Sequence, residues 1–165
     1  MPTSLKLGEA IVDAVVTKLK AGYAARVTTI NTEFSDFAIT APGTGDYYKA
    51  WLEAIPKTPA IVVAEGASEF GEEGPHSFIT QTIVGVYVLE QDPDLERLGK
   101  RLQRQARALL EVLWDDAPQE RLDLAPVIRI FPTGTTPGPV FEPQADQTWR
   151  SVYLVTFRVT VLEGS

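Results

Sequence analysis

Apolar residues recur at helical spacing in two stretches of the chain. In the first, from Leu5 to Ala21, the polar residues fall opposite an apolar stripe of Ile11, Val12, Val15, Val16 and Leu19. Gly22 is a suitable end for this helix, because glycine readily adopts the conformation that stops one. For residues 26–45 the pattern is irregular, and it predicts a loop with at most a short strand.

The second helical stretch begins at Asp92-Pro93 and ends near Trp114. We expect Asp92 as the cap and Pro93 at the first helical position, with Asp94 and Glu96 near the positive end of the helix dipole. One side of the helix carries Leu95, Leu98, Leu102, Ala106, Leu109 and Leu113. The opposite side carries Arg97, Lys100, Arg101, Arg104 and Arg107. The pattern therefore predicts a core helix with a basic outward face.

A shorter helix is expected from Asp46 to Ile55, with Asp46 as its N-cap and Pro56 as its end. Its apolar side would combine Tyr47 or Tyr48 with Trp51, Leu52 and Ile55.

Four β-branched or alternating runs predict strands, at 59–64, 77–89, 126–131 and 150–162. In the second run, even-numbered positions from Phe78 to Val88 form one face and Ile79, Ile83, Tyr87 and Leu89 the other. The sequences between the runs, EGASEFGEEGPH at 65–76 and PTGTTPGPVFEPQADQT at 132–148, are rich in glycine, proline and charge. They predict long loops.

This order of elements predicts an α+β domain. We expect about four strands in a largely antiparallel sheet, with the two long helices packed on one face. A length of 165 residues suits a single domain over 1–165. In the last strand, Tyr153, Val155, Phe157, Val159 and Val161 form an apolar face. The other face mixes Arg150, Val152, Leu154 and Arg158 with threonines, which is typical of a protein–protein interface.

The amino-acid composition excludes more classes of function than classes of fold. The chain has no cysteine, so disulfides and thiolate metal sites are excluded, and nothing in it resembles a signal peptide or a membrane span. These features favour a cytosolic origin. The formal net charge of −7 opposes general binding to nucleic acid.

The sequence offers no convincing catalytic, cofactor or metal site. Its single histidine, His76, lies near Glu72 and Glu73, but Gly74 and Pro75 interrupt any helix that would align them as metal ligands. Ser68 lacks the turn of a nucleophile elbow, and the glycines do not form a phosphate-binding loop. We therefore predict that the protein is not an enzyme.

Three interpretations of the basic helix face stay open. It can be a solvated surface, a contact with the acidic surface of a second copy, or a nucleic-acid site. The last has the least support, because no aromatic residues are interleaved with the basic ones and the chain is acidic.

In its layout the chain resembles the tail terminator, or tail completion, proteins of tailed bacteriophages and related neck proteins. The resemblance rests on the N-terminal helix, on IPKTPAIVVAEG, on ITQTIVGVYVLEQDPDLERLGKRLQRQARALLEVL, and on the closing strand RSVYLVTFRVTVLEG. It implies a virion protein, assembled in the host cytoplasm, whose copies form a ring of usually six subunits. Such a ring caps the tail tube and joins it to the neck or head connector, and DNA passes through it without specific binding.

The resemblance also suggests a role for the acidic stretch 65–76. Phe70 would be buried against the end of the tail tube, and Glu69, Glu72 and Glu73 would set the electrostatic register. Subunit contacts are expected at Arg97, Lys100, Arg101, Arg104, Arg107, Arg150, Val152, Leu154 and Arg158. The alternatives are another neck, head-completion or tail-tube-related protein, a nucleic-acid-binding module, and, more distantly, an enzyme built around His76.

Overall fold

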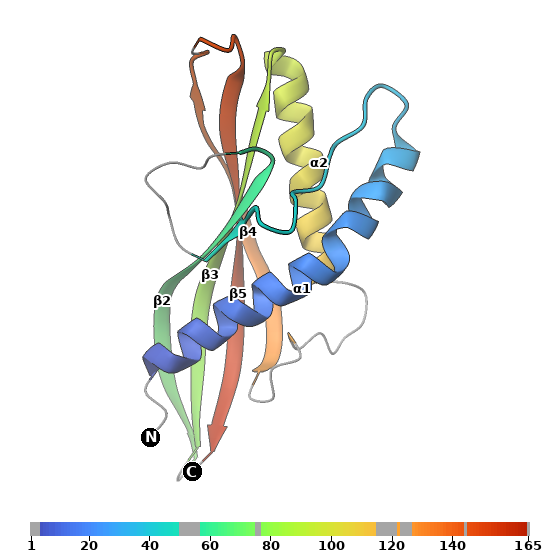
Figure 1. Cartoon of the computed structure of the whole chain (residues 1–165). Coiled ribbons are helices and arrows are strands. Elements are labelled where there is room, and N and C mark those ends of the chain that lie inside the picture. Colours follow the sequence, from blue (N-terminus) through green and yellow to red (C-terminus); the bar gives the residue numbers. More distant parts are fainter. Residues whose placement is uncertain are drawn as a thin grey trace.

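The computed structural model describes residues 4–49, 57–74, 77–114, 122, 127–143 and 145–164. Along the chain, the elements are α1 (Ser4–Glu33), β1 (Tyr47–Tyr48), β2 (Ala60–Gly74), β3 (Ser77–Asp92), α2 (Leu95–Leu113), β4 (Val127–Phe141) and β5 (Trp149–Gly164). The strands form a five-stranded sheet in the order β1-β2-β3-β5-β4 (Figure 1). Only the β1–β2 pair is parallel. The predicted α+β class is confirmed, and the additional strand is the two-residue β1.

Both helices cover the same face of the sheet and share one core with it (Figure 1). Alternate residues of the two central strands are fully buried there, namely Val84, Val86 and Val88 on β3 and Val155, Phe157, Val159 and Val161 on β5. The alternation predicted for both strands is thus confirmed. The helices add Ile11, Val15, Leu19, Leu98 and Leu109, among others.

Helix α1 is longer than the sequence pattern predicts, and the assignment of Gly22 as its end is wrong. The helix continues to Glu33 because Tyr23, Val27 and Ile30 prolong the buried stripe. Gly22 lies inside the helix, where a Cβ would be 3.4 Å from Val112 of α2, so its small size permits a close helix contact. In the last turn of the helix, the Asn31 side-chain amide exchanges two hydrogen bonds of 2.8 Å with the backbone of Ile39, which lies after the helix.

The prediction of a helix starting at Asp46 is also wrong. Residues 47–48 pair with Ile61 and Val62 as β1, and residues 50–56 lie outside the described part of the chain. Asp46 instead closes a turn, since its backbone N–H donates to Gly43 O at 2.9 Å and its carboxylate accepts from Gly43 N at 3.1 Å.

The two stretches predicted as long loops are largely strand. β2 runs to Gly74 and β4 to Phe141, each with irregularities in register where the chain bulges. Their sequences lack an apolar alternation because these outer parts of the sheet are not covered by the helices. Two long hairpins result, β2–β3 and β4–β5 (Figure 1).

Helix α2 starts two residues later than expected. Its N-cap is Asp94, whose carboxylate accepts a hydrogen bond of 2.9 Å from Arg97 N, so the prediction of Asp92 as cap is wrong. The predicted end is correct, because Trp114 is the C-cap. Leu95, which was assigned to the buried stripe, is exposed at the first turn.

Candidate assembly surfaces

The face of the sheet opposite the helices is mixed in character, as the sequence of the last strand predicts. Val152 and Leu154 on β5 are half-buried, and Arg150 and Arg158 are exposed. Strand register extends this face across neighbouring strands, where Tyr87 pairs with Leu154 and Leu89 pairs with Val152. Arg150 is held by Asp146 at 2.7 Å, and hydrogen bonds from Thr148 and Arg150 lower the pKa of that carboxyl.

A cluster at the β4 edge of the sheet escaped the sequence analysis. It combines Trp114, Arg129, Phe131 and Arg158, and we call it the edge patch. The Trp114 and Phe131 rings meet edge to face with centroids 5.8 Å apart, and the Arg129 guanidinium lies 4.8 Å from the centre of the Phe131 ring. Phe131 is the cross-strand partner of Arg158. Trp114 remains 51% exposed. In the sequence, Arg129 and Phe131 lie two positions apart, but only the pairing of β4 with β5 brings Arg158 beside them.

The basic residues of α2 all have acidic partners within the chain. Lys100 pairs with Glu96 at 2.8 Å, and Arg107 lies between Glu33 and Glu111. Arg97 and Arg101 share Asp92, at 2.8 and 2.7 Å. Burial of Asp92, which is 2% exposed, opposes its ionisation, but the hydrogen bonds from Arg97 and Arg101 outweigh that cost and its pKa is lowered. A face neutralised in this way gives little support to binding of nucleic acid.

Arg104 departs from the prediction of an outward basic face, because only 8% of it is exposed. Its guanidinium lies between the rings of Phe34 and Phe37, 4.0 and 4.1 Å from their centres. It also donates to the Asp36 carboxylate at 2.7 and 2.9 Å and to Phe37 O at 2.9 Å. These bonds lower the pKa of Asp36. Arg104 therefore attaches the segment after α1 to α2.

A buried polar cluster joins α1, α2 and β3 beneath this segment. Gln105 donates to Glu90 at 2.6 Å and to Thr40 O at 2.9 Å, and the Tyr23 hydroxyl donates to Gln105 O at 3.0 Å. Burial raises the pKa of both Tyr23 and Glu90, which favours the neutral form of each side chain. Each partner in the cluster has a hydrogen bond, which is consistent with a structural role.

The outer part of the β2–β3 hairpin carries the residues proposed for tube docking. Phe70 is 64% exposed and Glu69 is exposed as well. Phe70 is the cross-strand partner of Thr80. The backbone of Glu72 and Glu73 belongs to β2, whereas their side chains, and His76 as a whole, lie outside the described residues. The four proposed docking residues therefore sit on a strand and not in a loop.

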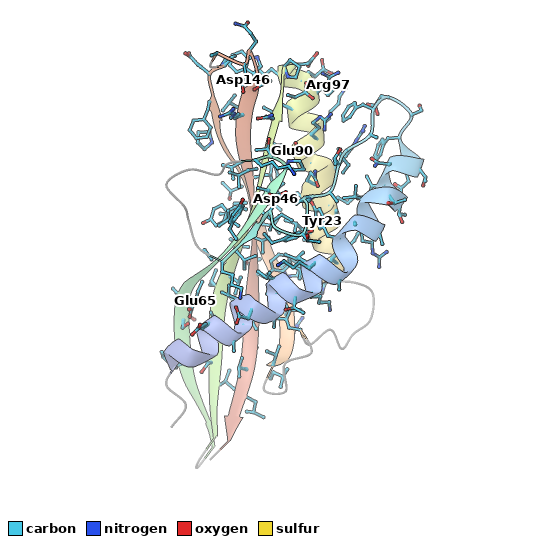
Figure 2. All side chains as sticks on the ribbon, in the orientation of Figure 1. Tyr23, Asp46, Glu65, Glu90, Arg97 and Asp146 are labelled. Carbon is cyan, nitrogen blue, oxygen red and sulfur yellow. The ribbon has the colours of Figure 1, made fainter. Side chains whose placement is uncertain are left out.

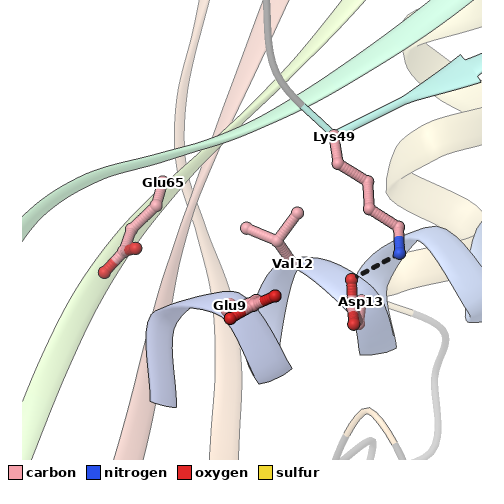
Figure 3. Close-up of a pocket in the computed structure, with 5 residues that line it drawn as sticks. All are labelled: Glu9, Val12, Asp13, Lys49 and Glu65. Carbon is pink, nitrogen blue, oxygen red and sulfur yellow. Dashed lines mark ion pairs between the residues drawn. The ribbon is translucent and has the colours of Figure 1, made fainter. Parts of the chain in front are cut away.

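A shallow hollow lies between α1 and β2 (Figure 3), and Figure 2 shows one of its residues, Glu65, beside the N-terminal part of α1. Its volume is about 340 Å³ and it is lined by Glu9, Val12, Asp13, Lys49 and Glu65. Asp13 is paired with Lys49 at 2.7 Å. We call this surface the acidic hollow.

Neither surface resembles a catalytic or metal centre. Within the described ranges, no three histidine, cysteine or acidic side chains come close enough to hold a metal ion. No helix in this part of the chain is both long and apolar enough to cross a membrane.

Comparison with known proteins identifies no family. No protein-family model and no curated protein matches the chain. Among solved structures, a chain in the virion of a native gene transfer agent particle is similar over 86% of this chain and 94% of its own length, with 9% sequence identity and a TM-score of 0.39. A function for this chain therefore has to be argued from its own sequence and geometry.

Proposed function

We propose that the chain is a structural virion protein whose copies form a ring, most specifically a tail terminator that caps the phage tail tube. The observation that carries this proposal is the sheet face without helices, where half-buried apolar residues stand beside exposed arginines. An exposed surface of this composition is typical of subunit contacts.

Two further features support an assembly role. The β2–β3 hairpin extends beyond the helices (Figure 1). Its outer part carries the exposed Phe70, an aromatic residue of the kind that is buried in protein contacts. The layout of helices and strands agrees with the resemblance to tail terminators that the sequence suggests.

In the proposed assembly, Arg150, Val152, Leu154 and Arg158 contribute to contacts between subunits, and the hairpin with Glu69 and Phe70 docks on the tail tube. Arg97, Lys100, Arg101 and Arg107 would add to the subunit contact only by exchanging partners, because each already has a carboxylate within the chain. The opposite side of the ring would meet the neck or head connector. DNA would pass through the centre, and the acidic chain would limit its adhesion.

The decisive test is tube capping. The tail-tube protein of the same phage is allowed to polymerise with and without this chain, and tube lengths are measured by electron microscopy. We expect tubes that stop growing and carry a ring at one end. Tubes of unchanged length without attached protein would contradict the terminator role, and attachment to a purified head connector alone would favour another neck protein.

A further inference from the structure

The edge patch lies at the β4 edge of the sheet, and the acidic hollow lies beside β2, toward the opposite edge. Phe131 and Arg129 belong to β4, which forms one edge, and Arg158 belongs to the neighbouring β5. Glu65 belongs to β2, and Glu9 lies on the part of α1 that crosses it (Figures 1 and 3). Two different surfaces meet the requirement of a head-to-tail contact, in which each copy offers one surface to each neighbour.

Within the described residues, the cations of the edge patch have no carboxylate partners. Among the described residues, neither Arg129 nor Arg158 forms an ion pair, in contrast to the basic residues of α2. The aromatic residues of the patch, Trp114 and Phe131, are 51% and 40% exposed. Arginine and tryptophan are the residues most enriched at energetically dominant interface positions. The composition of this patch therefore indicates a contact with an acidic protein surface.

The acidic hollow supplies such a surface on the same chain. Lys49 compensates Asp13, but Glu9 and Glu65 are exposed and form no ion pair within the described part of the chain. The Glu65 carboxylate lies over Gly8 of α1, where even a Cβ would collide with it. Within the described residues, the hollow thus exposes two carboxylates, those of Glu9 and Glu65, that have no ion-pair partner.

We propose that the edge patch of one copy docks on the acidic hollow of the next, with Arg129 and Arg158 directed at Glu9 and Glu65. This inference rests on the proposed ring and names the two surfaces that would close it. One patch lies on the outer face and the other on the helix side, so neighbouring sheets would overlap at their edges. Trp114 and Phe131 would supply the apolar contact, and the charges would set the register.

A charge exchange tests this pairing. Arg129→Glu with Arg158→Glu forms one variant, and Glu9→Lys with Glu65→Lys forms the other. Each alone should weaken ring formation at least about tenfold, since like charges would then meet across the contact. An equimolar mixture should regain the ring, because every junction then joins opposite charges. Mass is measured by size-exclusion chromatography with light scattering, and circular dichroism verifies folding.

The matched control is Lys20→Glu with Lys57→Glu, which changes the net charge by the same amount as the arginine variant but lies outside both surfaces. It should assemble like the wild type. Rings that survive both charge variants, a mixture that fails to reassemble, or a control that is equally impaired would each overturn the inference while leaving the proposed ring intact. A wild-type chain that never assembles would contradict the proposed function itself.

Discussion

At the scale of single residues, Arg104 shows how a charge that looks solvated in the sequence can hold two elements together. Helical projection places it with the other basic residues of α2, yet it is buried between Phe34 and Phe37 and bound to Asp36. No local pattern reveals this contact, because residues 34–37 are separated from it by more than sixty positions along the chain. Pairings of this kind depend on tertiary packing.

Arg104→Ala should lower the free energy of unfolding by about 2 kcal/mol, because it leaves an uncovered cavity between two rings and a carbonyl without its donor. Arg107→Ala is the matched control on the same helix. Its ion pair is well exposed, so its loss should cost less than about 1 kcal/mol. Urea denaturation measures the loss in free energy of unfolding for both variants. Equal losses would show that the burial of Arg104 adds nothing to stability.

Glu90 predicts a pH dependence of stability. It is 2% exposed, and burial raises its pKa above the ordinary value of 4.5. A raised pKa in the folded state means that the stability contributed by the protonated form is complete below pH 4.5 and is lost as pH rises through the folded-state pKa. Glu90→Gln has no carboxyl to ionise at this position. Its free energy of unfolding relative to that of the wild type should therefore rise as the pH is raised from about 4 to about 8. A difference that does not change with pH would refute this.

At the scale of elements, the sequence predicts the helices and strands whose side chains form the core. The buried faces of β3 and β5, the apolar stripe of α2 and the start of α1 all follow from regular apolar spacing. The outer parts of β2 and β4 carry no such spacing, since no helix covers them, and strand pairing alone makes them regular. The edge patch could not be predicted because its residues come from the end of α2, from β4 and from β5, and only the folded chain brings them together.

The β2–β3 hairpin yields a prediction about docking. Phe70→Ala removes a ring that is 64% exposed, so it should leave the melting temperature and ring formation unchanged. In the tube-capping assay it should weaken attachment about tenfold or more, as loss of an aromatic anchor does at a protein interface. Phe141→Ala, which removes a similarly exposed ring from β4, is the control and should cap normally. Full capping by Phe70→Ala would exclude this residue from docking.

At the scale of the whole molecule, the two helices cover one face of the sheet and, among the described residues, no helix covers the other face. Within the same residues, the basic side chains of α2 are paired with carboxylates, whereas Arg129 and Arg158 at the β4 edge form no ion pair. Such a subunit can make different contacts with two neighbours, which is the condition for a cyclic assembly. We therefore expect the isolated chain, or the chain on a tail tube, to form a closed ring.

The most direct test is the mass of the assembly in solution, measured by light scattering after size-exclusion chromatography and paired with negative-stain imaging. The proposed ring predicts a discrete species whose mass is a small multiple of 18.1 kDa, a hexamer by the resemblance to tail terminators, with a central hole in the images. A species of 18.1 kDa at every concentration, with no ring visible after tail tubes are added, would contradict it.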